Sequence, residues 1–555
     1  MMNLRKLLIA CVAILFSATS LFAQQNERGI DLYRAELYDA AKLFFLQQKN
    51  LSSESQAEAY YYLGQTYFEL GKKDSAAYYY KKAETTDANY PFSYIGQGRL
   101  DIANKQPKEA DAQFKKAGDL AKKDPSVYTS IAEIYIDNKM YKDAENALKK
   151  AEKVNKKYPG IYIVEGNKLR QEGDLGEAAR KYENAIYFDK NAKEAYLWFA
   201  RGYAEVNKEL ALGKLDELVN IDPNYIPAYA LIGDINYKRG YYKSAIDAYE
   251  KFISIPGVPI RQQKNYAELL YFTDQYEKSL EQINNVLKQE PSDIIMLRLK
   301  GYNNAKLGRA EESLVAMNKF FEEGSMNPEF EFIALDYTTL GQVYADLGQG
   351  DESLAAYEKA MTMPNAKVAD ILKGLTSAYE KNKDYPKAIE TFERYFALPE
   401  AEPVSTDYYH YGYDNYIMAS KHINDEDDTV LRSYIETGSK AFDKVIERTP
   451  DSYLGYIYKA RINSFIDSRQ LVQSNNTKMD GVARPYYEEV IPYLIAKNEN
   501  GSRDKDLLEA YNYFGSYYYV NRENALAGEY YKKMLEIDPE HEGAKSVLND
   551  LKIKY

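Results

Sequence analysis

The sequence contains few of the residues that most enzymes use for chemistry. Its 555 residues include three histidines, one tryptophan and a single cysteine, Cys11. No pair of histidines has the His-Glu-x-x-His spacing, and no serine has the Gly-x-Ser-x-Gly surroundings of a hydrolase nucleophile. We therefore expect no enzymatic activity, no bound cofactor and no metal centre.

Basic residues are too few to balance the acidic ones. The chain has 72 lysines and arginines against 84 aspartates and glutamates, which gives a net charge of -12. An acidic chain without a basic run binds the phosphates of nucleic acids poorly, and anionic lipid surfaces repel it. We therefore expect no nucleic-acid partner.

Long apolar runs are absent except at the N-terminus. Arg5 and Lys6 precede an apolar run that ends at Ala23, which is typical of a secretory signal peptide over residues 1–23. The run is short for a transmembrane helix, which needs about 20 apolar residues, and no later segment approaches that length. We expect an exported mature chain with no transmembrane segment, no cysteine and no disulfide.

Cys11 lies inside this apolar run and completes a short lipoprotein acylation box, Leu8-Ile9-Ala10-Cys11. Only four apolar residues separate it from Lys6, too few for the usual core of a signal peptide, and the run continues beyond the cysteine. We therefore favour the bacterial periplasm over an outer-membrane lipoprotein as the location of the protein.

A small residue recurs at a step of 34 residues, with one step of 33, along the first half of the chain. In the clearest units a second small residue follows twelve positions later, and a bulky one follows four positions after that. A period of this length predicts pairs of helices that pack closely and stack on the next pair. The recurring small residues are Gly64, Gly98, Ala132, Gly166, Ala200, Gly233, Ala267 and Gly301.

These units closely resemble tetratricopeptide repeats, whose pattern combines Leu-Gly, Tyr, Ala, Phe, Ala and Pro on two helices. An early unit matches the pattern through Tyr60, Leu63, Gly64, Tyr67, Gly71, Ala76, Tyr80 and Ala83. A late unit recovers it through Tyr511, Phe514, Gly515, Tyr518, Ala527, Tyr531 and Pro539. The resemblance implies an all-α fold, a right-handed superhelical solenoid of about 14 helix-turn-helix repeats.

Regularity decreases toward the C-terminus, and we divide the mature chain accordingly. We expect a regular array over residues 24–400, an irregular array with insertions over residues 401–540, and a capping helix over residues 541–555. The irregular part contains an acidic run, Asp425–Asp428. Its carboxylates are consecutive and not alternating, so we interpret the run as a solvated loop before a helix, not as a calcium site.

In this family, defined positions on the first helix of each pair line a concave groove. Carried over to this chain, these positions give Tyr61, Arg170, Arg201, Tyr237, Lys238, Lys264, Tyr271, Arg298 and Tyr302 as candidate partner-binding residues. A line of cations with interleaved tyrosines is suited to an acidic segment or a C-terminal carboxylate. The family's carboxylate clamp, Lys and Asn four residues apart, is not reproduced, because Ile163 precedes Asn167.

The resemblance and the predicted export favour a non-catalytic scaffold or adaptor that binds protein or peptide segments. By analogy, we expect it to serve an envelope complex for secretion, outer-membrane assembly or energised uptake. Two alternatives stay open. One is a SusD-like glycan-binding protein, although such proteins use tryptophan-rich platforms and this chain has only Trp198. The other is an enzyme with an unfamiliar site formed by Tyr408, Tyr409, His410 and Asp414.

Overall fold

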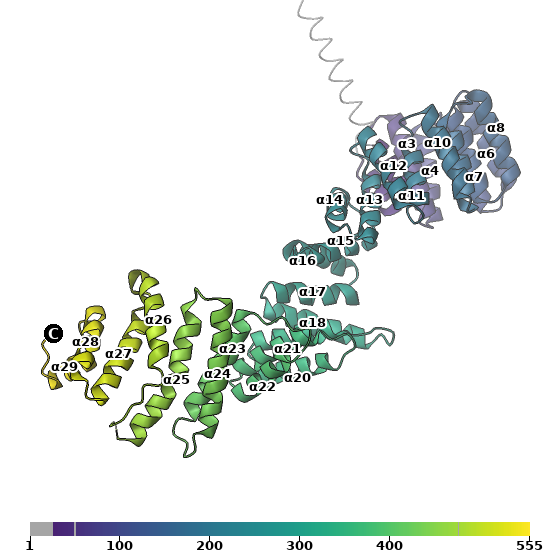
Figure 1. Cartoon of the computed structure of the whole chain (residues 1–555). Helices are drawn as coiled ribbons and strands as arrows, with labels where there is room; N and C mark the ends of the chain where they lie inside the picture. Colours follow the sequence, from purple (N-terminus) through teal and green to yellow (C-terminus); the bar gives the residue numbers. More distant parts are fainter. Residues whose placement is uncertain (1–25, 49–50, 476) are drawn as a thin grey trace, which may run out of the picture. The chain divides into compact units, whose positions relative to one another are not determined.

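The chain folds into consecutive helix pairs (Figure 1). The computed structural model of the protein describes residues 26–48, 51–475 and 477–555, so the predicted signal peptide and Cys11 lie outside the described residues. Within these ranges every regular element is helical, and the structure shows no strand there. The all-α prediction is therefore confirmed.

The chain divides into two compact units at Leu299 and Lys300, inside helix α17. Unit 1 begins with a helix over residues 26–34, which pairs with the next helix in the chain. The helices that follow are α2 (Tyr38–Leu46), α3 (Ser53–Glu69), α4 (Lys73–Thr86), α5 (Pro91–Ala103), α6 (Pro107–Leu120), α7 (Pro125–Asp137), α8 (Tyr141–Val154), α9 (Pro159–Gln171), α10 (Leu175–Phe188), α11 (Lys193–Tyr203), α12 (Lys208–Ile221), α13 (Ile226–Arg239), α14 (Tyr242–Ile253), α15 (Ile260–Phe272), α16 (Tyr276–Gln289) and α17 (Ile294–Lys306).

Unit 2 contains the part of the chain for which we predict insertions. The predicted change in regularity near residue 400 falls inside this unit, between two helices that pack on each other, α22 and α23. The helices of unit 2 after α17 are α18 (Ala310–Ser325), α19 (Ala334–Asp346), α20 (Gly350–Met361), α21 (Val368–Lys381), α22 (Tyr385–Phe396), α23 (Ser405–Lys421), α24 (Thr429–Arg448), α25 (Tyr453–Gln473), α26 (Arg484–Ala496), α27 (Asp504–Val520), α28 (Asn524–Ile537) and α29 (Glu542–Asp550).

Close packing within a pair depends on a glycine in the first helix and a tyrosine in the second. A Cβ atom built on the glycine would lie only 2.6 to 2.9 Å from the tyrosine ring, so the ring fills the space that a side chain would take. Buried tyrosines thus act as core residues, as large amphipathic rings often do. The pairs are Gly64 with Tyr80, Gly166 with Tyr182, Gly233 with Tyr249, Gly341 with Tyr357 and Gly515 with Tyr531.

The hydroxyl group of the same tyrosine reaches a polar residue directly after the glycine. Tyr80 donates a hydrogen bond to Gln65 at 2.6 Å, Tyr182 to Asn167 at 2.8 Å, and Tyr249 to Asp234 at 2.6 Å. A buried hydroxyl needs such a partner, because an unpaired polar group in the core is costly. The bond also fixes the orientation of one polar side chain on the first helix of each of these pairs.

The insertion of unit 2 is anchored by a buried carboxylate, Asp467 on α25. Its oxygens accept hydrogen bonds from the backbone N–H groups of Gly481, Val482 and Ala483, each at 2.8 to 2.9 Å, and from the hydroxyl of Tyr513 at 2.6 Å. Four donors compensate the desolvation of a carboxylate that is 0% exposed. Asp467 therefore ties the connection between α25 and α26 to helix α27.

The packing of glycine against tyrosine gives a testable prediction. We expect Gly166→Ala to destabilise the protein by about 1–3 kcal/mol, because the new methyl group would overlap the Tyr182 ring. Gly213→Ala is the matched control, since Gly213 lies in α12 with no atom near its Cβ position, and there alanine should stabilise by about 0.5–1 kcal/mol. Urea denaturation monitored by circular dichroism measures both effects, and equal changes for the two variants would contradict the packing argument.

Candidate functional site

A ladder of polar residues marks one face of unit 1. Gln65, Arg99, Glu133, Asn167 and Arg201 lie at intervals of 34 residues on α3, α5, α7, α9 and α11, the first helices of successive pairs. Residues at the same repeat position present their side chains to the same side of a stacked array. We call this side the inner face of unit 1.

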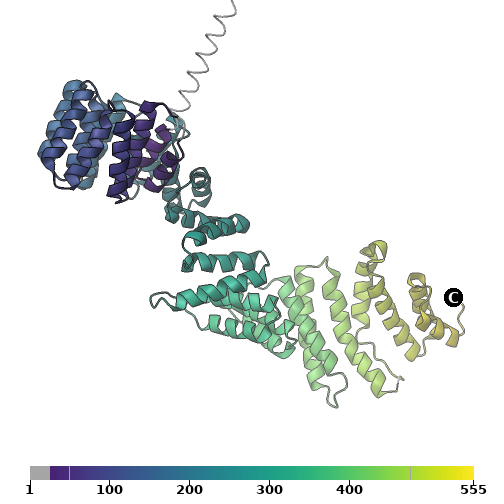
Figure 2. The ribbon, with the colours of Figure 1, turned by 180° about the vertical axis from the view of Figure 1, so that it is seen from behind.

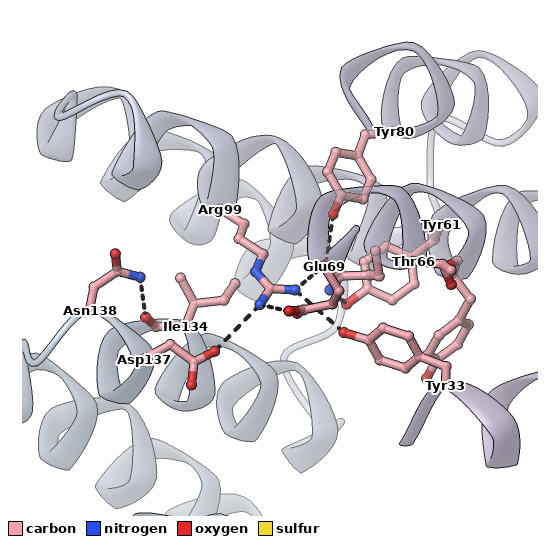
Figure 3. Close-up of polar contacts among 11 residues, drawn as sticks. Tyr33, Tyr61, Thr66, Glu69, Tyr80, Arg99, Ile134, Asp137 and Asn138 are labelled. Atoms are coloured by element: carbon pink, nitrogen blue, oxygen red, sulfur yellow. Dashed lines mark hydrogen bonds and ion pairs between the residues drawn. The ribbon is translucent and has the colours of Figure 1, made fainter. Parts of the chain in front are cut away.

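Arg99 is the hub of the inner face (Figure 3). Its guanidinium group donates to Gln65 at 2.8 Å and to Glu69 at 2.5 Å, and it lies 3.4 Å from both Asp137 and the Tyr33 hydroxyl. The arginine is only 7% exposed, so these partners compensate a charge that water does not reach. The network links α3, α5 and α7 with the first helix of the chain.

Arg99 is able to form this network because its own repeat lacks a tyrosine hydroxyl. Phe114 takes the place of the buried tyrosine there and packs against Gly98, so no hydroxyl of the pair competes for the residue after the glycine. The guanidinium group instead bonds to Gln65, the equivalent residue of the preceding repeat. The repeat with phenylalanine at the tyrosine position thus directs its inner-face residue, Arg99, to the preceding repeat.

Trp198 gathers two further arginines on this face. The guanidinium carbons of Arg170 and Arg201 lie over its ring, 4.1 and 4.5 Å from the ring centroid. Burial lowers the pKa of Arg201, Glu36 opposes this effect, and the neighbouring charge of Arg170 lowers the pKa further. Arg201 has an ion pair with Glu36 at 3.2 Å, whereas no carboxylate of the described residues lies within ion-pair distance of Arg170.

The first helix pair, drawn in purple in Figure 2, packs against α11. Lys193 on α11 binds Glu27 at 2.9 Å and Asp31 at 2.8 Å. Arg201 donates to the backbone oxygen of Ala35 at 3.1 Å, and Ala35 is 1% exposed. Residues 26–46 therefore cover part of the face that α11 presents.

Burial disfavours the ionised form of two carboxylates in this part of unit 1. Burial raises the pKa of Glu133, and Glu194 and Asp137 raise it further, while Arg34 and Arg99 oppose them. Burial also raises the pKa of Asp31 to about 6, although its ion pair with Lys193 works in the opposite direction.

The structure brings some of the predicted groove residues together and removes others from the surface. Arg170 and Arg201 meet at Trp198, as described above. Tyr61 is 3% exposed and accepts a hydrogen bond from Gln65, and Tyr302 is 4% exposed and donates to Asp336. The predicted role of Tyr61 and Tyr302 in partner binding does not fit this burial, because a partner cannot touch either ring without rearrangement of the core.

The remaining predicted residues are engaged within the protein. Lys238 pairs with Glu205, and Lys264 lies 2.5 Å from both Glu290 and Asp293. Local carboxylates therefore neutralise these two cations, and the continuous basic line expected from the sequence is interrupted. Tyr237 donates to Glu268 at 2.7 Å, Tyr271 packs against Phe272 and Tyr276, and Arg298 is half-buried on α17.

Sequence reasoning did not select Arg99 and Glu133, although a signal for both was present. Each lies one step of 34 residues from a residue of the same ladder, so the period that predicts the helices also predicts their side. The contacts of residues 26–46 with α11 could not be predicted in this way. The repeat period relates neighbouring repeats, whereas Arg201 and Glu36 are about 165 residues apart.

The described residues contain no group of three or more His, Cys, Asp and Glu side chains arranged to hold a metal ion. A search of the same residues for a helix with the length and apolar character of a membrane span found none. The cluster of Tyr408, Tyr409, His410 and Asp414 that we considered for catalysis lies on α23, where His410 bonds to Glu380 at 3.0 Å and Asp414 is buried.

Paired helices at a fixed step define a helical-repeat protein. Models of the tetratricopeptide repeat match residues 26–93, 125–158, 226–257 and 338–402. Each of these segments is thus similar to the tetratricopeptide repeat, and none of these matches is to a catalytic family.

Two characterised sequences and one solved structure illustrate the similarity. The chain is 25% identical over 236 residues to the TPR repeat-containing protein MJ1428 of Methanocaldococcus jannaschii, which covers 42% of this chain and 40% of that protein. It is 27% identical over 93 residues to the small glutamine-rich tetratricopeptide repeat-containing protein 2 of Mycosarcoma maydis, which covers 17% of this chain and 26% of that protein. The matched segments thus span well under two thirds of either relative. The C-terminal part of a TPR repeat-containing protein from Cytophaga hutchinsonii aligns with 52% of this chain and 99% of that structure, at 21% identity and a TM-score of 0.40.

Proposed function

We propose that this protein is a non-catalytic scaffold that binds an acidic protein segment on the inner face of unit 1. The observation that carries the proposal is the stack of Arg170 and Arg201 on Trp198. Among the described residues, no carboxylate pairs with the guanidinium group of Arg170, which lies next to a second guanidinium group. A carboxylate of a partner would relieve the repulsion between the two groups.

The chemistry of the stack favours carboxylate over other ligands. A guanidinium group binds a carboxylate through two parallel hydrogen bonds, and such charge-assisted bonds are about twice as strong as neutral ones. The indole ring holds the guanidinium plane in place, so less conformational freedom is lost on binding. The partner would therefore offer an acidic side chain or a C-terminal carboxylate.

We infer an exported location from the N-terminal sequence alone. Arg5, Lys6 and the apolar run that ends at Ala23 support transport to the bacterial periplasm. In that compartment a scaffold of this kind would serve an envelope complex for secretion, outer-membrane assembly or energised uptake. The glycan-binding alternative gains no support from Trp198, because this ring is 3% exposed and carries the two arginines.

The single tryptophan makes the proposed site directly measurable. Acidic peptides with a free C-terminal carboxylate should change the fluorescence of Trp198 in a saturable manner, and amidated peptides without acidic residues should not. We expect Arg170→Gln to weaken binding about tenfold or more, because it removes a charge-assisted bond without breaking an ion pair of the protein.

Arg180→Gln is the matched control for this titration. Arg180 lies on α10, its side chain is 60% exposed, and it pairs with Glu177, three residues earlier on the same helix. Its replacement should leave the affinity unchanged. Equal binding by the protein and by Arg170→Gln would move the partner site away from Trp198, and no binding of any acidic peptide would argue against the proposed function.

A further inference from the structure

The negative charge of this protein is concentrated in one unit. Residues 300–555 carry 30 lysines and arginines against 43 aspartates and glutamates, a net charge of -13. Residues 1–299 carry 42 against 41, so they are almost neutral. A field of one sign attracts ligands of the opposite sign and raises their rate of association. Unit 2 therefore favours a cationic partner, in contrast to the acidic segment proposed for unit 1.

Unit 2 also carries a continuous row of aromatic rings on two neighbouring helices. Tyr409, Tyr413 and Tyr416 lie on one side of α23, and their rings meet those of Tyr458 and Phe465 on α25. The centroids of rings in contact are 5.0 to 6.2 Å apart. All five side chains are half-buried, so each keeps part of its ring at the surface. We call these five residues the aromatic row.

The protein already places a cation against this row. The guanidinium carbon of Arg461 lies 4.9 Å from the centroid of the Tyr458 ring. Asp506 and Glu509 hold the same guanidinium group at 2.8 and 2.7 Å. A ring face together with nearby carboxylates forms a favourable site for an arginine or lysine, because the ring quadrupole and the negative charges act in the same direction.

A carboxylate also lies near the other end of the row. Glu380 on α21 bonds to His410, which follows Tyr409 on α23. Carboxylates therefore lie near both ends of the aromatic row. An external chain with basic side chains would find exposed ring surface in an acidic surrounding.

We propose that the aromatic row of α23 and α25 is a second interaction surface, which binds a lysine- or arginine-bearing segment of a partner protein. The basic side chains of that segment lie over the rings of Tyr413 and Tyr416, and the charge of unit 2 draws the segment to the row. The protein then has two surfaces of opposite preference, one in each unit. This proposal does not depend on the Trp198 site.

Fluorescence anisotropy with a labelled peptide tests the aromatic row. The probe is a flexible peptide of alternating glycine, serine and arginine, and its counterpart has glutamate in place of each arginine. We expect the basic peptide to bind the full chain and the acidic counterpart not to bind at unit 2. Binding should weaken as salt is added, because the attraction is partly electrostatic.

Three variants separate ring recognition from general charge attraction. We expect Tyr413→Ala combined with Tyr416→Ala to weaken binding of the basic peptide about tenfold or more, and the corresponding change to phenylalanine to keep it. Tyr187→Ala is the matched control, because Tyr187 is a 75% exposed tyrosine of unit 1. Circular dichroism melting establishes that each variant is folded.

The possible results are distinct. Equal affinity of the protein and the double alanine variant, or no binding of the basic peptide at all, would overturn the proposal. Equal binding of a neutral peptide or of a soluble oligosaccharide would overturn it too, since the row would then select aromatic contact and not charge. Trp198 fluorescence recorded in the same titration reports on unit 1, so failure of one surface can be told from failure of the other.

Discussion

Replacement of Arg99 by alanine should destabilise unit 1 by about 3–5 kcal/mol, because it removes one partner of a buried charge network. Glu69 loses a contact of 2.5 Å, and Asp137 loses a contact of 3.4 Å. Burial already raises the pKa of Asp137, and the charge of Arg99 opposes this effect, as does a hydrogen bond with Gln171. The alanine variant removes this compensation from both carboxylates, and the amide oxygen of Gln65 keeps the hydrogen bond from Tyr80 but loses the one from Arg99.

The fluorescence of Trp198 during urea denaturation measures this loss where it occurs. Long repeat arrays need not unfold in a single step, so a probe inside unit 1 is preferable to an average over the chain. Arg180→Ala, which removes an exposed arginine, should leave the transition unchanged. A shift for Arg99→Ala no larger than that of Arg180→Ala would show that the network contributes specificity and not stability.

Much of the fold could be predicted because each repeat contacts mainly its neighbours. The glycine at position 64 and its equivalents report directly on the closest approach of two helices, and a Cβ there would overlap the Tyr80 ring. The interpretation of most tyrosines as core residues follows from the same geometry, and Tyr80, Tyr182 and Tyr249 are fully buried. The local sequence pattern was therefore sufficient to predict the helix pairs and their core residues.

The candidate site could be predicted only in part, since burial depends on contacts that no period records. Tyr61 occupies a position that faces the groove in the family pattern, but here it packs against Tyr90 and Phe92 and is buried. The ion pairs of Lys193 with Glu27 and of Arg201 with Glu36 join residues far apart in the chain. Closure of this kind follows from three-dimensional stacking and not from spacing along the sequence.

The two proposed surfaces share one construction principle. Arginines stack on an aromatic ring in both, over Trp198 in unit 1 and over Tyr458 in unit 2. The difference lies in the carboxylates: Arg461 is held by Asp506 and Glu509, whereas Arg170 has no such partner among the described residues. Where cations outnumber carboxylates around the ring, we expect an acidic partner, and where carboxylates predominate, we expect a basic one.

Replacement of Asp414 by asparagine should stabilise unit 2, and the gain should increase with pH. Burial and the nearby Glu380 together raise the pKa of Asp414 from 3.8 to about 9. Both carboxylate oxygens lack a hydrogen-bond donor, and the side chain is 0% exposed. The folded protein therefore keeps this carboxyl protonated at neutral pH, whereas the unfolded chain ionises it.

The sign of the pH dependence follows from proton binding. Between pH 4 and pH 9 the unfolded state binds fewer protons at Asp414 than the folded state, so the contribution of this group to stability falls as pH rises. An amide cannot ionise, and its N–H groups can donate to Glu380. We expect Asp414→Asn to be more stable than the protein by about 2 kcal/mol at pH 8 and nearly equal to it close to pH 4.

Thermal melting by circular dichroism from pH 4 to pH 9 compares the two proteins. The difference in Tm should grow steadily across this interval, and Asp451→Asn, which changes an exposed aspartate before α25, should show no such trend. A constant difference at all pH values would mean that Asp414 has the same protonation state in the folded and unfolded chain. A lower Tm for Asp414→Asn at pH 8 would instead show that the folded protein holds a carboxylate at this position and that the ionised side chain contributes to stability.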